Sequence, residues 1–303
     1  MARCSRHWRR SPISLRRKWR LDGSMSTPEL AAFFAPGTAG KLFSLLYCPP
    51  ANITVRGAVM YLAPVAEEMN KGRRMAALQA RAWANVGWFV LQQDSFGCGD
   101  SAGEFADATW AGWLADALRA AHWLAERTGH RPVLWGARAG ALLACAMAHQ
   151  DELLRQVLFW HPVASGKLLL QQLLRLKVAG NLFAAEPGGA STRQWRACWE
   201  AGQGVEIAGY EWSSALALAC DALALTPPSG GGQLAWLELA GGPASDLSPA
   251  AQAGVSAWRA AGWAVDAQPV SGAAFWQVVE IVEVPELIHY STQMLENLPA
   301  VDI

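Results

Sequence analysis

The sequence predicts an α/β fold with a mostly parallel, doubly wound sheet. Short apolar runs typical of buried strands alternate along the chain with helical stretches, as they do in parallel sheets covered by helices on both faces. Residues 136–140, Gly-Ala-Arg-Ala-Gly, follow one such strand and lead into an apolar helix, which indicates a tight strand-to-helix turn. With 303 residues, 52% of them hydrophobic, the chain can bury a large core as one domain with an insertion.

The first elements of the predicted sheet lie between residues 42 and 128. Residues 42–48 alternate loosely between apolar and polar and end at Pro49-Pro50, which favours a strand followed by a turn. Residues 57–62 are an apolar run that ends at Ala63-Pro64, so we expect a buried strand there. We then expect an amphipathic helix over 71–85, a buried strand over 88–91 and a helix over 110–128.

The remaining core elements continue the alternation. Residues 132–135 predict a short buried strand, and the small and apolar residues of 139–149 predict a helix packed on all sides. A further strand is expected over 157–160. Near the C-terminus we expect strands over 234–239 and 264–270 and helices over 250–261 and 286–295.

The alternation stops between residues 165 and 232. Residues 168–178 show a leucine-rich helical pattern, and a second helical run covers 212–225. Glycine and proline clusters punctuate the segment. The sequence therefore divides into a core of residues 25–165 and 233–303 and an inserted cap of residues 166–232. We expect the leucine face of the first cap helix to pack on its own domain rather than on a membrane or a partner.

The N-terminal leader differs in charge from the rest of the chain. Residues 1–20 carry eight Arg or Lys and no acid, whereas the chain from Met25 onward has 17 basic and 24 acidic residues. Such a leader could bind nucleic acid or anionic lipid, or act as a transit segment, but it lacks the apolar stretch of a secretory signal. We interpret residues 1–24 as an over-extended start or a disordered tail, and expect no nucleic-acid partner.

Cysteine usage bears on the compartment and on metal binding. The six cysteines are scattered and contain no C-x-x-C pair. This pattern argues against a disulfide framework or a zinc site and favours a reducing compartment. No stretch approaches the ~20 apolar residues of a membrane span. We therefore expect a cytoplasmic protein without a cofactor or bound metal.

The loops after the predicted strands carry the most specific signals. The segment 93–103 contains the pattern D-x-x-G-x-G-x-S-x-G, from Asp94 to Gly103, and the segments 63–75 and 160–167 follow two other strands. Together with the turn at 136–140, these loops resemble the exosortase A system-associated hydrolase 2 family, from Leu42 to the C-terminus. The resemblance implies an α/β-hydrolase fold with a cap over the active site. It also implies a role beside PEP-CTERM protein sorting and exopolysaccharide synthesis in bacteria.

A serine-hydrolase triad is not complete in this sequence. In this fold the order is nucleophile, acid, histidine, and the nucleophile position, between the two glycines, holds Arg138. A guanidinium is protonated at working pH and has no lone pair with which to attack a carbonyl. Asp246 is the candidate acid. The loop where the histidine belongs offers Phe275, and His161, after another strand, is expected to bond to backbone rather than to act as a base.

The arginine at this turn needs compensating charge, because a helix N-terminus carries about +0.5 of an elementary charge. Glu67, Glu68, Asp94 and Glu104 should converge on the same sheet edge. If one of them pairs with Arg138, the site is neutralised internally. If none does, the guanidinium and free helix N–H groups would form a receptor for phosphate or carboxylate.

Three functional hypotheses follow. The first is a degenerate hydrolase scaffold that binds a small anionic molecule or a protein of the exosortase and exopolysaccharide system, with Arg138, Glu67, Glu68, Asp94, His161 and Ser165 as candidate binding residues. The second is an active ester or thioester hydrolase that uses non-standard groups such as Ser101, Ser165 or Cys98. The third is a structural subunit whose cap docks on another protein.

Overall fold

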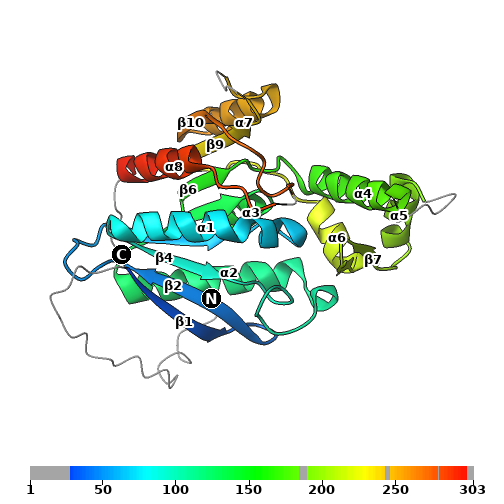
Figure 1. Ribbon diagram of the computed structural model, residues 1–303, viewed down its shortest axis with the longest axis horizontal. Helices are drawn as coiled ribbons and strands as arrows, with labels where there is room; N and C mark the ends of the chain where they lie inside the picture. Colours follow the sequence, from blue (N-terminus) through cyan, green and yellow to red (C-terminus); the bar gives the residue numbers. More distant parts are fainter. Residues whose placement is uncertain (1–27, 184–189, 243–245, 279, 299–303) are drawn as a thin grey trace.

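The computed structural model describes residues 28–183, 190–242, 246–278 and 280–298, so the predicted leader lies outside the described residues. These residues form a central sheet covered by helices, with a smaller lobe at one end of the molecule (Figure 1). The lobe corresponds to the inserted segment between β6 (Gln156–Trp160) and β9 (Gly232–Ala240). Among the described residues, no helix combines the length and the apolar character needed to cross a membrane.

The sheet has eight strands in the order β1-β2-β4-β3-β5-β6-β9-β10 among the described residues. β1 and β2 are antiparallel to each other and β2 is antiparallel to β4, whereas the remaining neighbours are parallel. The mostly parallel, doubly wound sheet predicted from the sequence is thus confirmed. The strands are β1 (Glu29–Pro36), β2 (Lys41–Cys48), β3 (Gly57–Leu62), β4 (Trp88–Gln93), β5 (Pro132–Ala137), β6 (Gln156–Trp160), β9 (Gly232–Ala240) and β10 (Trp263–Ser271).

Helices cover both faces of the sheet. On one face, α1 (Glu67–Asn85) and α8 (Pro285–Asn297) pack Met75, Trp83 and Leu287 against the central strands. On the other face lie α2 (Trp110–Thr128), α3 (Gly140–Gln150) and α7 (Pro249–Ala260). Because both faces are covered, every residue of β3 and β5 is buried, which explains why their sequences are continuous apolar runs rather than alternating ones.

The lobe has its own small core. It consists of α4 (Gly166–Phe183), α5 (Thr192–Glu200), the hairpin of β7 (Val205–Ile207) and β8 (Tyr210–Trp212), and α6 (Ser214–Asp221). The leucines at 169, 170, 173 and 174 pack with Trp199 and Trp212, and also with Phe105 of the short 3₁₀ helix Phe105–Asp107 and with Trp113 of α2. The leucine face of α4 therefore packs on its own chain, as predicted.

Parts of the lobe and the sheet edge differ from the sequence prediction. The helix predicted over 212–225 is wrong at its start: Trp212 belongs to β8, and α6 begins after Ser213, whose hydroxyl accepts a hydrogen bond from the Leu216 N–H. The cap is also not wholly helical, since it contains the β7–β8 hairpin. α5 and β1 had not been predicted, and α1 begins at Glu67 rather than at Lys71.

Candidate functional site

The turn between β5 and α3, residues 136–140, is called the elbow below. Its two glycines are required by close packing. A Cβ on Gly136 would lie 2.6 Å from the Ala141 Cα, and one on Gly140 would collide with the carbonyl oxygen of Leu62 at the end of β3. The elbow therefore brings the start of α3 directly against the sheet edge.

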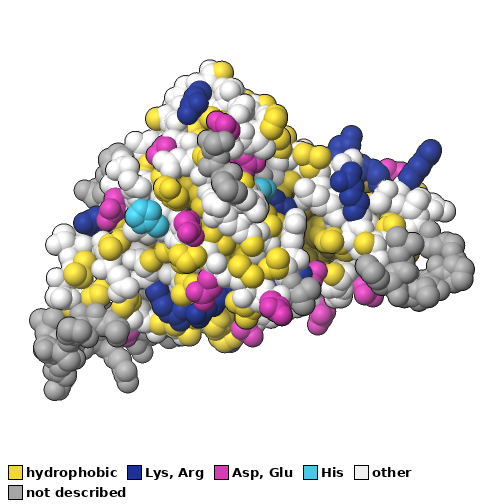
Figure 2. Space-filling model, turned by 45° about the horizontal axis from the view of Figure 1, so that its top comes forward, with side chains coloured by type: hydrophobic (Ala, Val, Ile, Leu, Met, Phe, Trp, Pro, Cys, Tyr) yellow, Lys and Arg dark blue, Asp and Glu magenta, His cyan; other side chains and the backbone are white. Residues whose placement is uncertain are grey.

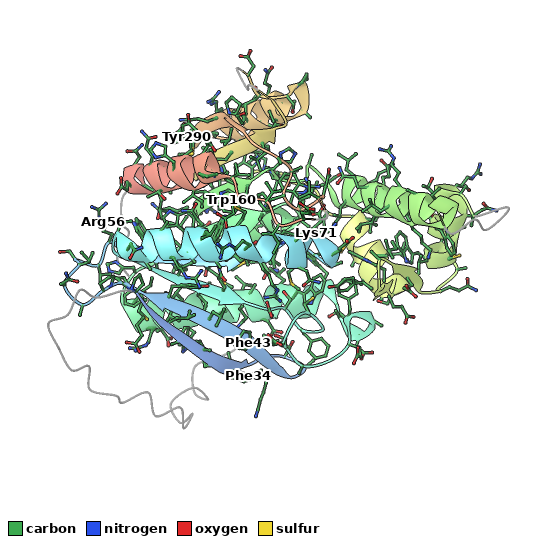
Figure 3. All side chains as sticks on the ribbon, in the orientation of Figure 1. Phe34, Phe43, Arg56, Lys71, Trp160 and Tyr290 are labelled. Carbon is green, nitrogen blue, oxygen red and sulfur yellow. The ribbon has the colours of Figure 1, made fainter. Side chains whose placement is uncertain are left out.

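Arg138 sits at the apex of the elbow with a left-handed backbone. Its φ is 52°. This backbone conformation costs a non-glycine residue on the order of 1–3 kcal/mol and persists only where the surrounding structure holds it. Here the Arg138 N–H donates to the Trp160 carbonyl at 2.9 Å, and the Arg138 carbonyl accepts from the Ala141 N–H at 3.1 Å. Trp160, labelled in Figure 3, thus ties the elbow to the end of β6.

The guanidinium of Arg138 is buried and donates four hydrogen bonds. Its Nε and Nη2 donate to the two carboxylate oxygens of Glu68 at 3.3 and 3.2 Å. Nη1 donates to the His161 carbonyl at 3.2 Å, and Nη2 also donates to Oε1 of Gln172 at 2.9 Å. The group lies 4.8 Å from the ring centre of Trp276, a cation–π distance. The Arg138 side chain is only 5% exposed and that of Glu68 12%, so this is a buried bidentate ion pair.

Glu68 comes from the first turn of α1, which begins shortly after the end of β3. Burial raises the pKa of the Glu68 carboxyl above its usual value, and attraction to Arg138 counteracts this rise. The carboxylate is thus held in an apolar setting mainly by the one guanidinium. Without Arg138 it would be a buried charge with little compensation.

The other candidate carboxylates have different partners. Glu67 pairs with Lys71 one helical turn away, at 2.9 Å (Lys71 is labelled in Figure 3). Asp94 accepts from Arg73 at 3.0 Å and from the Asp100 N–H at 3.1 Å, and so shapes the glycine-rich loop. Glu104 is exposed. Of the four carboxylates that the sequence offered for Arg138, Glu68 is the one that pairs with it.

His161 is held as a neutral ring. Its Nδ1 accepts a hydrogen bond from the Leu239 N–H at 3.1 Å, so the ring proton resides on Nε2. Burial, followed by the charge of Arg138, lowers the pKa of His161 from 6.5 to about 4. The ring also lies 4.8 Å from Trp276, centre to centre. This agrees with the interpretation of a strand-end histidine bonded to backbone.

The remaining triad positions supply no base beside Arg138. Phe275 is buried and packs against Trp160 and Trp276, with ring centres 6.1 and 5.1 Å apart. Asp246 is exposed. The loop after β10 therefore contributes aromatic packing at the place where a hydrolase presents its histidine.

The non-standard nucleophile candidates have structural contacts. The Ser101 hydroxyl donates to the Asp94 carbonyl at 2.6 Å and accepts from the Phe43 N–H at 2.9 Å. The Ser165 hydroxyl accepts from the Leu168 N–H at 3.3 Å, at the start of α4. Burial raises the pKa of the Cys98 thiol to about 12, so it stays protonated and unreactive at neutral pH.

Gln172 and Trp276 belong to the site although the sequence analysis did not select them. Gln172 carries the lobe's contact with Arg138 and is exposed on its outer side. A second link between core and lobe runs from the Asn70 side-chain amide to the Tyr210 hydroxyl, at 2.7 Å. A polar residue within a leucine-rich helix, in a segment expected to cover the site, was the available signal for Gln172.

Two small cavities lie against β3, and the residues that line them do not include the elbow. The larger, about 30 Å³, lies between α1 and the sheet and is lined by residues that include Tyr61, Met69 and Arg73. The other, about 20 Å³, is lined on the α2 side by residues that include Tyr61, Trp113 and Asp116. Each is large enough for a water molecule.

Comparison with known proteins gives the fold. No family model and no curated protein matches the chain. Among solved structures, Est1E from Butyrivibrio proteoclasticus with bound ferulic acid is similar, with a TM-score of 0.61 and 11% identity over 88% of this chain and 98% of that one. XC6422 from Xanthomonas campestris, an α/β serine hydrolase without a lid, has a TM-score of 0.53 and 16% identity over 90% and 97%. The chain has an α/β-hydrolase fold.

We expect Arg138→Ala to reduce the free energy of unfolding by about 3–5 kcal/mol, because it leaves the Glu68 carboxylate buried and unpaired. Arg138→Met combined with Glu68→Gln should recover much of this loss. Arg56→Ala removes the pair with Glu296, in which both side chains are exposed, 51% and 42%, and should cost only about 1 kcal/mol or less. Urea unfolding of the four proteins checks this, and an Arg138→Ala variant no less stable than Arg56→Ala would contradict it.

We also expect the stability to depend on pH through His161. Because its pKa falls from 6.5 to about 4 in the folded protein, the unfolded chain binds a proton first as the pH drops. Stability should therefore fall between these two pH values, by up to about 1.4 kcal/mol per unit. His161→Asn removes the titrating group and tolerates the positive φ. Unfolding midpoints of both proteins from pH 7 to pH 4 measure the difference, and parallel curves would refute the assignment.

Proposed function

We propose that this protein acts by binding rather than by serine-type hydrolysis. The observation that carries the proposal is the buried guanidinium at the nucleophile position, which contacts Glu68, His161, Gln172 and Trp276. An arginine in this position cannot attack a carbonyl, and its neighbours fill the space with an ion pair and an indole ring. The residues that could replace the nucleophile are engaged in loop and helix-cap hydrogen bonds or are protonated thiols.

The binding partner is a protein or a small anionic molecule of the exosortase A and exopolysaccharide system, in the cytoplasm. The system is taken from the family that the loop segments resemble. Since Glu68 already neutralises Arg138, an anionic ligand would have to displace Glu68 from the guanidinium. A protein partner would not have to displace Glu68 and is therefore the simpler candidate. Co-purification with proteins of that system tests this candidate.

A fluorophosphonate probe, which labels activated serines, should leave the wild-type protein unlabelled under conditions where an active serine esterase is labelled fully. Arg138→Ser should remain unlabelled as well, because the loop after β10 offers Phe275 and Trp276 instead of a base, and Nδ1 of His161 is occupied by the Leu239 N–H. Labelling of the wild type at Ser101 or Ser165, together with turnover in an esterase or thioesterase panel, would establish the active-hydrolase alternative instead.

Inorganic phosphate tests whether the Arg138 guanidinium is available to an anion or is already occupied by Glu68. In the wild type it should leave the melting temperature unchanged, because Glu68 occupies the guanidinium. In Glu68→Gln the guanidinium loses its carboxylate partner, and phosphate should raise the melting temperature by a few degrees. Glu67→Gln, which removes a neighbouring carboxylate paired with Lys71, is the matched control. If phosphate raised the melting temperature of the wild type, Arg138 would be an open anion receptor. If phosphate left the melting temperature of all three proteins unchanged, a small anion at this site would be excluded.

A further inference from the structure

The outer half of α4 is exposed although it carries leucines. At about 100° per residue, the buried side chains Leu169, Leu170, Leu173 and Leu174 fall on one half of the helix. The exposed side chains fall on the other half. This exposed half is not explained by the packing of the lobe.

The exposed half is ordered into two adjacent rows of residues spaced four apart. One row consists of Lys167, Gln171 and Arg175, all exposed. The other consists of Leu168, Gln172 and Leu176, with Leu168 45% and Leu176 53% exposed. A basic row thus lies beside an apolar row along the same helix.

At this spacing Lys177 falls on the buried half of α4. It lies over the Trp195 ring at 4.4 Å, which connects α4 to α5, where Arg193 is exposed. The acids Glu200 of α5 and Asp221 of α6 are both paired with Arg196 of α5. Figure 2 shows Lys and Arg side chains gathered on the lobe, at the right of the view. We call Lys167, Leu168, Gln171, Arg175 and Leu176 the α4 surface.

We propose that the α4 surface docks on a membrane whose phospholipid headgroups are anionic. The basic row would lie at the phosphates while the two leucines enter the boundary between headgroups and acyl chains, as in helices that lie in the membrane interface. A helix face with a narrow apolar row can dock on a fluid surface, which needs no matching pocket. An acidic protein would engage the cations but would gain from the leucines only with a complementary groove. The proposal does not depend on the binding function assigned above.

With few charges and two leucines, the docking should be reversible and weakened by salt. Gln172 lies in the apolar row and also holds Arg138, so a docked membrane would lie over the outer side of the elbow. The lobe would then be the part of the molecule that faces the lipid.

Co-sedimentation of the full chain with vesicles tests the proposal. We expect binding to phosphatidylcholine vesicles that contain phosphatidylglycerol, loss of binding in high salt, and little binding to phosphatidylcholine alone. Lys167→Gln/Arg175→Gln should lower the partition coefficient by roughly 10- to 30-fold, from about 1 kcal/mol for each cation. Leu168→Ser/Leu176→Ser should lower it by about tenfold.

Matched variants control for charge and apolarity in general. Arg56→Gln/Arg74→Gln removes the same charge from exposed positions of the core, where these side chains are 51% and 49% exposed. Leu30→Ser/Leu153→Ser removes leucines that are 45% and 52% exposed. Both controls should bind like the wild type. The proposal would be overturned if the wild type did not bind these vesicles. It would also be overturned if the α4 variants bound them as strongly as the wild type does, because the basic residues 1–24 would then account for the binding. A third outcome would also overturn it. If the wild type binds polyglutamate and Lys167→Gln/Arg175→Gln does not, while Leu168→Ser/Leu176→Ser binds vesicles like the wild type, the α4 surface binds acidic polymers through its cations alone.

Discussion

The buried ion pair between Arg138 and Glu68 is the interaction on which the arrangement of this site depends. A cation at a helix N-terminus is unfavourable, and a carboxylate in the same apolar setting is unfavourable by itself. Each makes the other tolerable. Because Glu68 comes from α1, Arg138 from the elbow, Gln172 from α4 and Trp276 from the loop after β10, the pair also fixes the relative position of four parts of the chain. Core and lobe thus meet at a charge pair where a serine hydrolase has a reactive group.

Much of the fold could be predicted because its central strands are buried on both sides. Continuous apolar runs such as 57–62 and 132–135 are easy to recognise, and the glycine-rich loop between Asp94 and Gly103 indicated which sheet edge would carry the site. The elbow could also be predicted from the sequence, because close packing requires glycine at both of its ends. The set of carboxylates near Arg138 followed from the rule that parallel strands end at a common edge.

What the sequence did not reveal depends on neighbours distant in the chain. β1 lies at the sheet edge and exposes Leu30 and Phe34, so its outward residues are apolar and no alternation is visible. β7 and β8 are too short to display a period. Which of the four candidate acids would reach Arg138 depended on helix α1 beginning one turn earlier than predicted, because this places Glu68 in the first turn, beside the elbow. Trp276 was hidden among sixteen tryptophans, most of which belong to the core.

The close packing of the elbow glycines has a consequence for how such motifs are interpreted. Gly136 and Gly140 are required by the distance between α3 and the end of β3, whatever residue stands between them. The spacing of these glycines is therefore a signature of a steric constraint on the backbone. A chain with this turn must keep the two glycines, because side chains there would push α3 away from the end of β3, whereas the central residue can be exchanged. Glycine patterns of this kind report on architecture, and only the residue that they enclose reports on reactivity.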